Sequence, residues 1–243
     1  MKLMHISDLH IGKKLFETSM LEDQRYILNR ILDLLDDERP DAVLIAGDVY
    51  DRANPTADAM ELLDEFLSAL ALRGICTMII SGNHDSPERL AYARRFLENR
   101  NIHISPVYNG HIEPIVLSDA YGEVCFWLMP YVHPDSVGGF FADQTIRNAQ
   151  DAAQAVIGEM RVDPNKRNVI LSHQFIIGGT TSDSERRNIG TLENVDAALY
   201  DAFDYVALGH LHRPQNIGGR TEPCATAARR WSIPERKWMQ KNP

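Results

Sequence analysis

Residues 42–51 read AVLIAGDVYD, and this stretch decides the fold. Five apolar residues end at Gly47 and are followed at once by Asp48 and Asp51, which is typical of a buried strand that stops at a polar loop. The same arrangement recurs in CTMIISGNHD, residues 76–85, and in KLMHISDLH, residues 2–10. Three predicted strands therefore each deliver polar side chains at their carboxyl ends.

The segments between these strands have the spacing of helices. Apolar residues recur on one helical face at positions 21, 28, 31, 32 and 35, and again at positions 60, 63, 67 and 70. The resulting order is strand, helix, strand, helix, strand. Repeated units of this kind predict an α/β fold, in which ligands bind at the carboxyl ends of the strands.

The second half of the chain is richer in predicted strands. Ser86 and Pro87 suit the cap and first turn of a helix that runs to about Glu98, and a further helix is expected near residues 146–160. Strands are expected at residues 112–117, 124–128, 168–172 and 205–209. Residues 178–188 are polar and lack periodicity, which predicts a mobile loop near the strand ends.

Length and composition fit one large domain in a reducing compartment. The 243 residues are 44% hydrophobic, and the three cysteines lie far apart in the sequence, so no disulfide framework is expected. Polar residues follow the N-terminus too soon for an ordinary signal peptide, and no stretch is apolar enough to span a membrane, so we expect a cytoplasmic protein. A net charge of −9 is unusual for a protein that binds DNA by bulk electrostatics, so any such contact must be local, metal-assisted or shared with a partner.

Polar motifs follow five predicted strands. They are Asp8-Leu9-His10, Gly47-Asp48-Val49-Tyr50-Asp51, Gly82-Asn83-His84-Asp85, Ser172-His173 and Gly209-His210-Leu211-His212. Alternate residues of an extended segment point the same way, so each Asp-x-His or His-x-His pair can reach one site. Carboxylate, imidazole and amide groups without thiolates suit Mn²⁺, Fe or Zn²⁺. Two such ions about 3.5–4 Å apart can hold the attacking and the leaving oxygen of a displacement at phosphorus, and Asp48 is the candidate bridging ligand.

Each motif alone also has a structural interpretation. Residues 82–85 could form a simple turn, Asp48 could cap a helix, and His173 could be a hydrogen-bonded core residue. The joint occurrence of the motifs, each after a predicted strand, favours a metal centre. Asp51 and Asp85 are expected to orient its imidazoles. The remaining histidines have no partner at ligand spacing and are interpreted as structural; they are His5, His103, His111 and His133.

In this order the motifs D-x-H, G-D-x-x-D, G-N-H-D, a single H and G-H-x-H resemble the calcineurin-like metallophosphoesterase superfamily. More closely, HISDLHIGKKL, IAGDVYDRANP, ISGNHDSPERL, LSHQFIIGG and LGHLHRPQ resemble the nuclease subunits of bacterial SbcC and SbcD complexes, over about residues 1–219. The resemblance implies an α/β fold, built as a two-sheet metallophosphoesterase sandwich flanked by helices. It also implies a centre of two divalent metal ions, with Mn²⁺ as the expected metal.

The resemblance further implies roles within the site. Asp8, His10 and His212 would bind one ion, Asn83, His173 and His210 would bind the other, and Asp48 would bridge them. His84 would not bind metal. It would be the catalytic residue that donates a proton or hydrogen bond to the leaving oxygen, as general acid catalysis requires.

The same resemblance implies action on DNA. The expected activity is Mn²⁺-dependent cleavage, as an exonuclease on duplex ends and as an endonuclease on hairpins or single strands, in DNA repair, recombination and replication. The implied partners are an SMC-type ATPase, SbcC, and a second copy of the chain, bound through the helices after the first two metal motifs. Basic residues after the motifs could hold phosphates or simply belong to solvated faces; these are Lys13, Lys14, Arg52, Arg89, Arg94, Arg95 and Arg100.

Two other functions remain open. A phosphatase or cyclic-nucleotide phosphodiesterase of the same superfamily would share the motifs, so the metal ligands alone cannot discriminate. The stretches GDVYDRANP and LSHQFIIGG favour the nuclease. An inactive scaffold that binds partners would be expected to have lost some ligands, whereas every ligand position is filled here.

Residues 220–243 differ from the nuclease domain expected at residues 1–219. The stretch CATAARRWSIPERKWMQKNP has no apolar periodicity and predicts no ordinary element, so one hypothesis is a short basic tail. A second is a truncated or frame-shifted remnant of the DNA-capping region of related subunits. Permitted codons for residues 223–234 encode VRYCGTPLEYS when read from the third base, which resembles the Tyr-x-Gly-Thr/Ser-Pro segment of the family. Under the second hypothesis the tail would not support docking of the ATPase, and sequencing the gene tests it.

Overall fold

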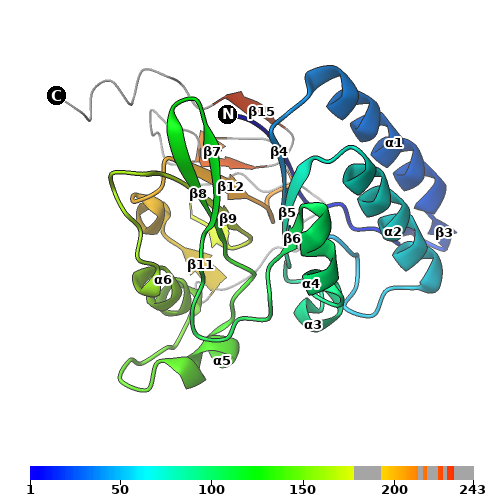
Figure 1. Ribbon diagram of the computed structural model, residues 1–243. Coiled ribbons are helices and arrows are strands. Elements are labelled where there is room, and N and C mark those ends of the chain that lie inside the picture. The colour runs from blue at the N-terminus through cyan, green and yellow to red at the C-terminus, as the bar shows by residue number, and fades with distance from the viewer. Residues whose placement is uncertain (178–192, 213–215, 218–223, 227–228, 233–243) are drawn as a thin grey trace.

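The computed structural model describes residues 1–177, 193–212, 216–217, 224–226 and 229–232. Two β-sheets lie face to face, and helices cover the outer side of each sheet (Figure 1). This arrangement is the α/β sandwich expected from the sequence. The loop expected at residues 178–188 lies outside the described residues. No helix of the described segments is both long and apolar enough to cross a membrane.

The first sheet contains the three strands on which the fold prediction rests. Its order is β15-β1-β4-β5-β6, with β1, β4, β5 and β6 parallel and β15 antiparallel to β1. The strands are β1 (Lys2–Ile6), β4 (Ala42–Ala46), β5 (Cys76–Ile80), β6 (Ile102–Ile104) and β15 (Arg229–Ser232). The helices that follow them are α1 (Leu21–Glu38), α2 (Ala57–Leu72), α3 (Pro87–Leu90) and α4 (Arg94–Leu97).

The second sheet is mixed and has the order β13-β14-β12-β9-β8-β7. Its strands are β7 (Ile115–Asp119), β8 (Gly122–Leu128), β9 (Arg167–Ser172), β12 (Tyr205–Leu208), β13 (Asn216–Ile217) and β14 (Cys224–Thr226). Helices α5 (Pro134–Val137) and α6 (Ala149–Glu159) lie on its outer side. Two small pairs complete the described strands: β2 (Lys14–Leu15) with β3 (Thr18–Ser19), and β10 (Phe175–Ile176) with β11 (Asn194–Val195).

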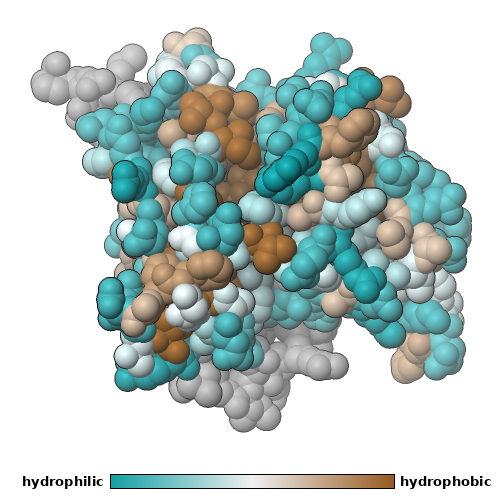
Figure 2. Space-filling model, turned by 60° about the horizontal axis from the view of Figure 1, so that its bottom comes forward, coloured by the Kyte–Doolittle hydropathy of each residue, from teal (hydrophilic) through white to brown (hydrophobic). Residues whose placement is uncertain are grey.

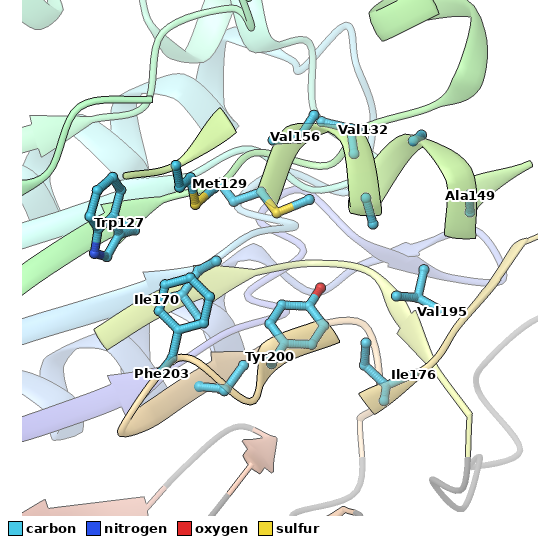
Figure 3. Packing of buried hydrophobic residues seen from close by; sticks show 14 of the residues in the cluster. Trp127, Met129, Val132, Ala149, Val156, Ile170, Ile176, Val195, Tyr200 and Phe203 are labelled. Carbon is cyan, nitrogen blue, oxygen red and sulfur yellow. The ribbon is translucent and has the colours of Figure 1, made fainter. Parts of the chain in front are cut away.

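Apolar side chains fill three layers between these elements. One layer lies between the sheets and includes Leu44, Met78 and Phe126, which alternate along their strands with residues that face the helices. A second lies between the first sheet and helices α1 and α2. The third packs α6 against the second sheet, where Val156 faces Ile170 and Tyr200 (Figure 3). Burial on both faces explains why the central strands read as continuous apolar runs.

Some local expectations differ from the structure. The helix expected from Pro87 to about Glu98 is broken, because Ala93 has a left-handed φ of 61° that separates α3 from α4. No glycine or proline marks this break in the sequence. Met60, expected on the buried face of α2, is exposed. The face of the molecule in Figure 2 is mostly hydrophilic, with hydrophobic side chains in several separate groups.

The region after residue 219 was expected to hold no ordinary element, yet it contributes two strands. β14 pairs with β12, and β15 pairs with β1 over Lys2–His5. Both add backbone hydrogen bonds at the side of an existing strand, which requires no apolar periodicity of their own. The domain boundary at residue 219 and the hypothesis of a frame-shifted tail stay predictions.

Candidate metal centre

The carboxyl ends of five strands meet at one edge of the sandwich. The loops after β1 and β4 run side by side, since the backbone N–H of Asp8 donates to the carbonyl of Gly47 at 3.0 Å. The loop after β12 joins them from the second sheet, where the N–H of His210 donates to Oδ1 of Asp8 at 3.1 Å. All eight residues singled out in the sequence lie in this region.

Asp8, His10 and His212 form the first group. The Nε2 atoms of His10 and His212 are 3.3 Å apart, and Nε2 of His212 lies 3.6 Å from Oδ1 of Asp8. One ligand atom from each of the three residues lies within 4.8 Å of the other two. These are the residues that the resemblance assigned to one ion.

Asn83, His173 and His210 form the second group, and Asp48 lies between the two. Oδ1 of Asn83 is 3.0 Å from Nδ1 of His210, and the rings of His173 and His210 meet edge to face at 5.4 Å. Oδ2 of Asp48 lies 3.3 Å from Nε2 of His173 and 3.7 Å from Nε2 of His10. Asp48 therefore lies between a residue of each group, and its role as a bridging ligand stays a prediction.

His84 lies at the open side of the centre, with 42% of its side chain exposed. Its Nδ1 is 2.9 Å from the backbone carbonyl of Asp51, and its Nε2 is 4.0 Å from Oδ2 of Asp48. An Nδ1–H that donates to this carbonyl leaves Nε2 facing the site. Atoms of His10, Asp48 and His84 also lie within 4.8 Å of one another, so distance alone would permit His84 to bind an ion. Its role as the acid stays a prediction.

The backbone of the centre adopts conformations that side chains rarely permit. Asp8, His10, Asp48 and His210 have φ values of 55°, 44°, 49° and 74°, all in the left-handed region. Strain of this kind clusters at functional sites, where the surrounding structure holds it in place. Gly82 is needed for close approach, because a Cβ there would overlap the carboxylate of Asp48.

Asp85 holds two of these loops together. Its carboxylate accepts hydrogen bonds from the backbone N–H of Val49 at 3.1 Å, of Tyr50 at 2.8 Å and of Gly82 at 2.8 Å. The expectation that Asp85 orients an imidazole is therefore wrong: it binds the backbone of the segments that carry Asp48 and Asn83. A carboxylate has enough lone pairs for all three donors.

Gln24 of α1 also contacts the centre, and the sequence analysis missed it. Its side-chain amide binds the backbone of the loop that carries Asp8 and His10. A signal was available, because Gln24 lies three residues after Leu21 and four before Leu28, on the helix face that is otherwise apolar. A polar side chain on an otherwise apolar helix face is expected to form hydrogen bonds inside the protein.

Burial and charge set the protonation of the site. Burial lowers the pKa of His10 to about 3 and the pKa of His210 to about 4, so both imidazoles are neutral at pH 7. Burial opposes charge on His173 as well, but the carboxylates of Asp48 and Asp8 raise the pKa of His173 to about 9. The same pairing with His173 keeps the pKa of Asp48 below its usual range despite burial. The two carboxylates therefore favour a positive charge between them.

These residues fit divalent metal ions. Nε2 of His173 is buried between Asp8 and Asp48 and makes no well-oriented hydrogen bond, which is costly unless another ligand satisfies it. Nε2 of His10 also faces the centre, whereas its Nδ1 lies 3.6 Å from Oδ1 of Asp51. Imidazoles, carboxylates and an amide oxygen form the donor set, which suits Mn²⁺, Fe or Zn²⁺, and a cation bound between Asp8 and Asp48 would take the place of the proton that these carboxylates favour on His173.

The other histidines have structural contacts. Nδ1 of buried His5 lies 3.0 Å from the hydroxyl of Tyr205, across the space between the sheets. Nδ1 of His133 accepts a hydrogen bond from the N–H of Asp135 and caps α5. Among the described residues, neither these two nor His103 and His111 join a group that could hold a metal ion.

Comparison with known proteins identifies the family. Residues 1–214 match the calcineurin-like phosphoesterases. The chain belongs to the calcineurin-like phosphoesterase family. Members of this family are metal-dependent hydrolases, and the site described above lies wholly within the matched residues.

Relatives within the family are nuclease subunits. The chain is 39% identical over 221 residues to the SbcD subunit of the nuclease SbcCD from Staphylococcus saprophyticus, and 40% identical over 221 residues to that from Staphylococcus epidermidis. Each alignment covers 89% of this chain and 58% of the relative. The chain thus spans little more than half the length of these relatives.

Two solved structures share the fold. A dimetal phosphatase from Danio rerio superposes with a TM-score of 0.56 at 13% identity, over 93% of this chain and 85% of the other. The protein TT1561 of Thermus thermophilus gives a TM-score of 0.54 at 12% identity, over 93% of this chain and 88% of the other. At such low identity they support the architecture alone.

Proposed function

We propose that this chain is the catalytic part of a Mn²⁺-dependent DNA nuclease that hydrolyses phosphodiester bonds with two metal ions. The observation that carries the proposal is that seven side chains able to bind a metal ion meet at one edge of the fold, in a chain about 40% identical to curated nuclease subunits. The proposed substrates are duplex ends, hairpins and single strands of DNA. The proposed setting is DNA repair and recombination in the cytoplasm, together with an SMC-type ATPase.

The proposed roles of the residues are those that the resemblance implied. Asp8, His10 and His212 would hold one ion, Asn83, His173 and His210 the other, and Asp48 both. When bound, such a pair of ions supplies an activated water and neutralises charge on the phosphate. His84 is the exposed imidazole of the group, with Nδ1 beside the carbonyl of Asp51 and Nε2 toward the site. In the protonated ring both nitrogens carry a hydrogen, so the proton on Nε2 would pass to the leaving oxygen while Nδ1–H stays bound to the carbonyl.

The neighbouring basic residues give limited support to DNA binding. Arg94 forms an ion pair with Glu98 at 2.9 Å, Arg52 lies 3.7 Å from Asp51, and Arg89 donates to Asn54 at 2.6 Å. These contacts fit a solvated surface more than a phosphate groove. With a net charge of −9, the ions themselves and a partner would supply most of the attraction for DNA.

Cleavage assays on three substrates test the proposal. Purified chain would be incubated with Mn²⁺ and linear duplex DNA, hairpin DNA or a generic phosphomonoester, beside Asp48→Ala. The proposal expects cleavage of DNA that requires Mn²⁺ and is lost in the variant. Turnover of the monoester with no cleavage of either DNA would instead identify a phosphatase.

A homodimer is part of the proposal. Between α2 and the segment of α3 and α4 lies a groove of about 850 Å³, beside the exposed apolar side chains of Met60, Leu72, Tyr92 and Phe96. Exposed apolar side chains gathered beside a groove are typical of protein interfaces. A second copy of the chain would cover these side chains. The interface would then include α2, as the family implies, but it would use α3 and α4 in place of α1.

The dimer is tested by sedimentation of Phe96→Glu beside Phe16→Glu. Both phenylalanines are exposed, but Phe16 lies in the hairpin of β2 and β3, outside the groove. The parent chain and Phe16→Glu should sediment as dimers and Phe96→Glu as a monomer. A monomeric parent, or a dimer that persists in Phe96→Glu, would contradict this interface.

A further inference from the structure

The loop after β1 carries two of the proposed ligands and is held from two sides. On one side it follows the loop after β4: the N–H of His10 donates to the carbonyl of Asp48 at 3.0 Å, and the N–H of Ile11 donates to that of Val49 at 2.9 Å. These bonds use the donors of the loop. They do not involve the carbonyl of Leu9, the N–H of Gly12 or the carbonyl of His10, which also accepts from the N–H of Lys13 at 3.0 Å.

Gln24 of α1 binds those remaining groups. Its Nε2 donates to the carbonyl of Leu9 at 3.1 Å and to that of His10 at 2.7 Å. Its Oε1 accepts from the N–H of Gly12 at 2.9 Å. One side chain thus binds both arms of the turn that contains His10.

Only a primary amide can make all three bonds. Two donors and one acceptor are required at a fixed distance from the helix. Glutamate would keep the acceptor for Gly12 but would bring an oxygen against two carbonyls. Methionine has the same length and offers neither a donor nor a strong acceptor.

The turn needs such support because its conformation is unfavourable. Asp8 and His10 both have left-handed φ values, 55° and 44°, and glycine is at neither position. The bond from Gln24 to the carbonyl of His10 fixes the peptide that follows this residue. Without it, the turn can relax toward an ordinary conformation and withdraw both side chains from His212.

We propose that Gln24 is a positioning residue for one of the two metal ions, the one assigned to Asp8, His10 and His212. This inference rests on the proposed two-metal site. The three hydrogen bonds of Gln24 go to backbone groups of the loop that carries Asp8 and His10, so Gln24 would act through this backbone. The second group, Asn83, His173 and His210, lies on loops that Gln24 does not contact, so only one ion should depend on it.

The test is a titration of the metal-free chain with Mn²⁺, followed by electron paramagnetic resonance of free and bound ion. Gln24→Met and Gln24→Glu would be compared with the parent and with Gln150→Met. Gln150 is a matched control, because it is a half-buried glutamine on α6 whose Oε1 accepts from the N–H of Asp196 at 2.7 Å, away from the centre. Melting of each metal-free protein is recorded in parallel.

The parent and Gln150→Met should bind two ions and show the spin-coupled signal of a close pair. Gln24→Met should weaken one binding step about 10- to 100-fold, leave the other unchanged and lose the coupled signal at low Mn²⁺. Saturating Mn²⁺ should restore the rate of DNA cleavage with an unchanged KM for DNA. Gln24→Glu should show the same weakening of one binding step. If Gln24→Met does not fold, the result for Gln24→Glu tests the inference.

Two unchanged binding steps in the Gln24 variants would overturn the inference. Equal weakening of both steps, with a lower melting temperature of the metal-free protein, would also overturn it, because that result indicates a general structural role. A parent that binds no pair of ions would contradict the proposed function itself. The two failures are therefore distinguishable.

Discussion

Replacement of Asp85 by asparagine tests whether this buried carboxylate holds the two metal-bearing loops together. In the parent, one oxygen accepts from Val49 and Gly82 and the other accepts from Tyr50. The amide nitrogen of asparagine has no lone pair, so at least one buried N–H must lose its acceptor. The remaining bonds lose the assistance of the negative charge.

The expected cost follows from these bonds. A lost hydrogen bond to a charged group costs about 1.5–3 kcal/mol, and the weakening of two more would bring the total to about 3 kcal/mol. Burial raises the pKa of Asp85 despite its three donors, so the neutral amide recovers part of the cost of burying a charge. We therefore expect a loss of about 2 kcal/mol, which lowers the melting temperature of a chain of this size by roughly 4–8 °C.

Thermal unfolding of metal-free protein measures this effect, with Asp163→Asn as the control. Asp163 also accepts from a backbone N–H, that of Asn165 at 2.9 Å, but in an exposed turn. Its substitution should cost less than about 0.5 kcal/mol. If Asp85→Asn were as stable as this control, the carboxylate would not hold the loops in the way described.

Three further predictions concern the acid, the ions and pH. His84→Ala should slow DNA cleavage about 10²- to 10⁴-fold while two Mn²⁺ ions remain bound. Loss of an ion in this variant would show that His84 is a metal ligand and contradict its role as the acid. Saturation with Mn²⁺ at about 100 times Kd should stabilise the parent by about 2.7 kcal/mol for each ion, or about 5.4 kcal/mol for the pair. EDTA or Asp48→Ala should remove this gain in thermal unfolding, and an equal gain in Asp48→Ala would show that the ions bind elsewhere. Burial lowers the pKa of His5 from 6.5 to about 4, so between these values the unfolded chain binds a proton that the folded chain does not. The free energy of unfolding should therefore fall as pH drops from 6.5 toward 4, and it should fall by about 3 kcal/mol more in the parent than in His5→Gln. Equal pH profiles of the two proteins would contradict the prediction.

Local sequence predicted the elements that bring the site together. The runs that end at Gly47, Gly82 and Gly209 are buried strands, and their parallel pairing places the polar residues at one edge. The requirement for glycine at positions 82 and 209 could not be explained by the preference of glycine for turns alone. The structure shows that the backbone there passes against Asp48 and His173, which leaves no space for a Cβ.

Contacts between segments far apart in the chain could not be predicted from local sequence patterns. β15 pairs with β1 across more than two hundred residues, and a strand that joins an edge carries no periodicity of its own. Asp85 was recognised as part of a motif, but its partners are backbone groups, which no side-chain pattern records. The break at Ala93 was not predictable either, because helix propensity is favourable on both sides of it.

The central claim is that seven side chains hold two ions, with Asp48 between them. Anomalous scattering from crystals of the chain grown with Mn²⁺ tests it most directly. The account predicts two peaks about 3.5–4 Å apart, one beside Asp8, His10 and His212 and the other beside Asn83, His173 and His210. A single peak, or two peaks away from Asp48, would contradict it.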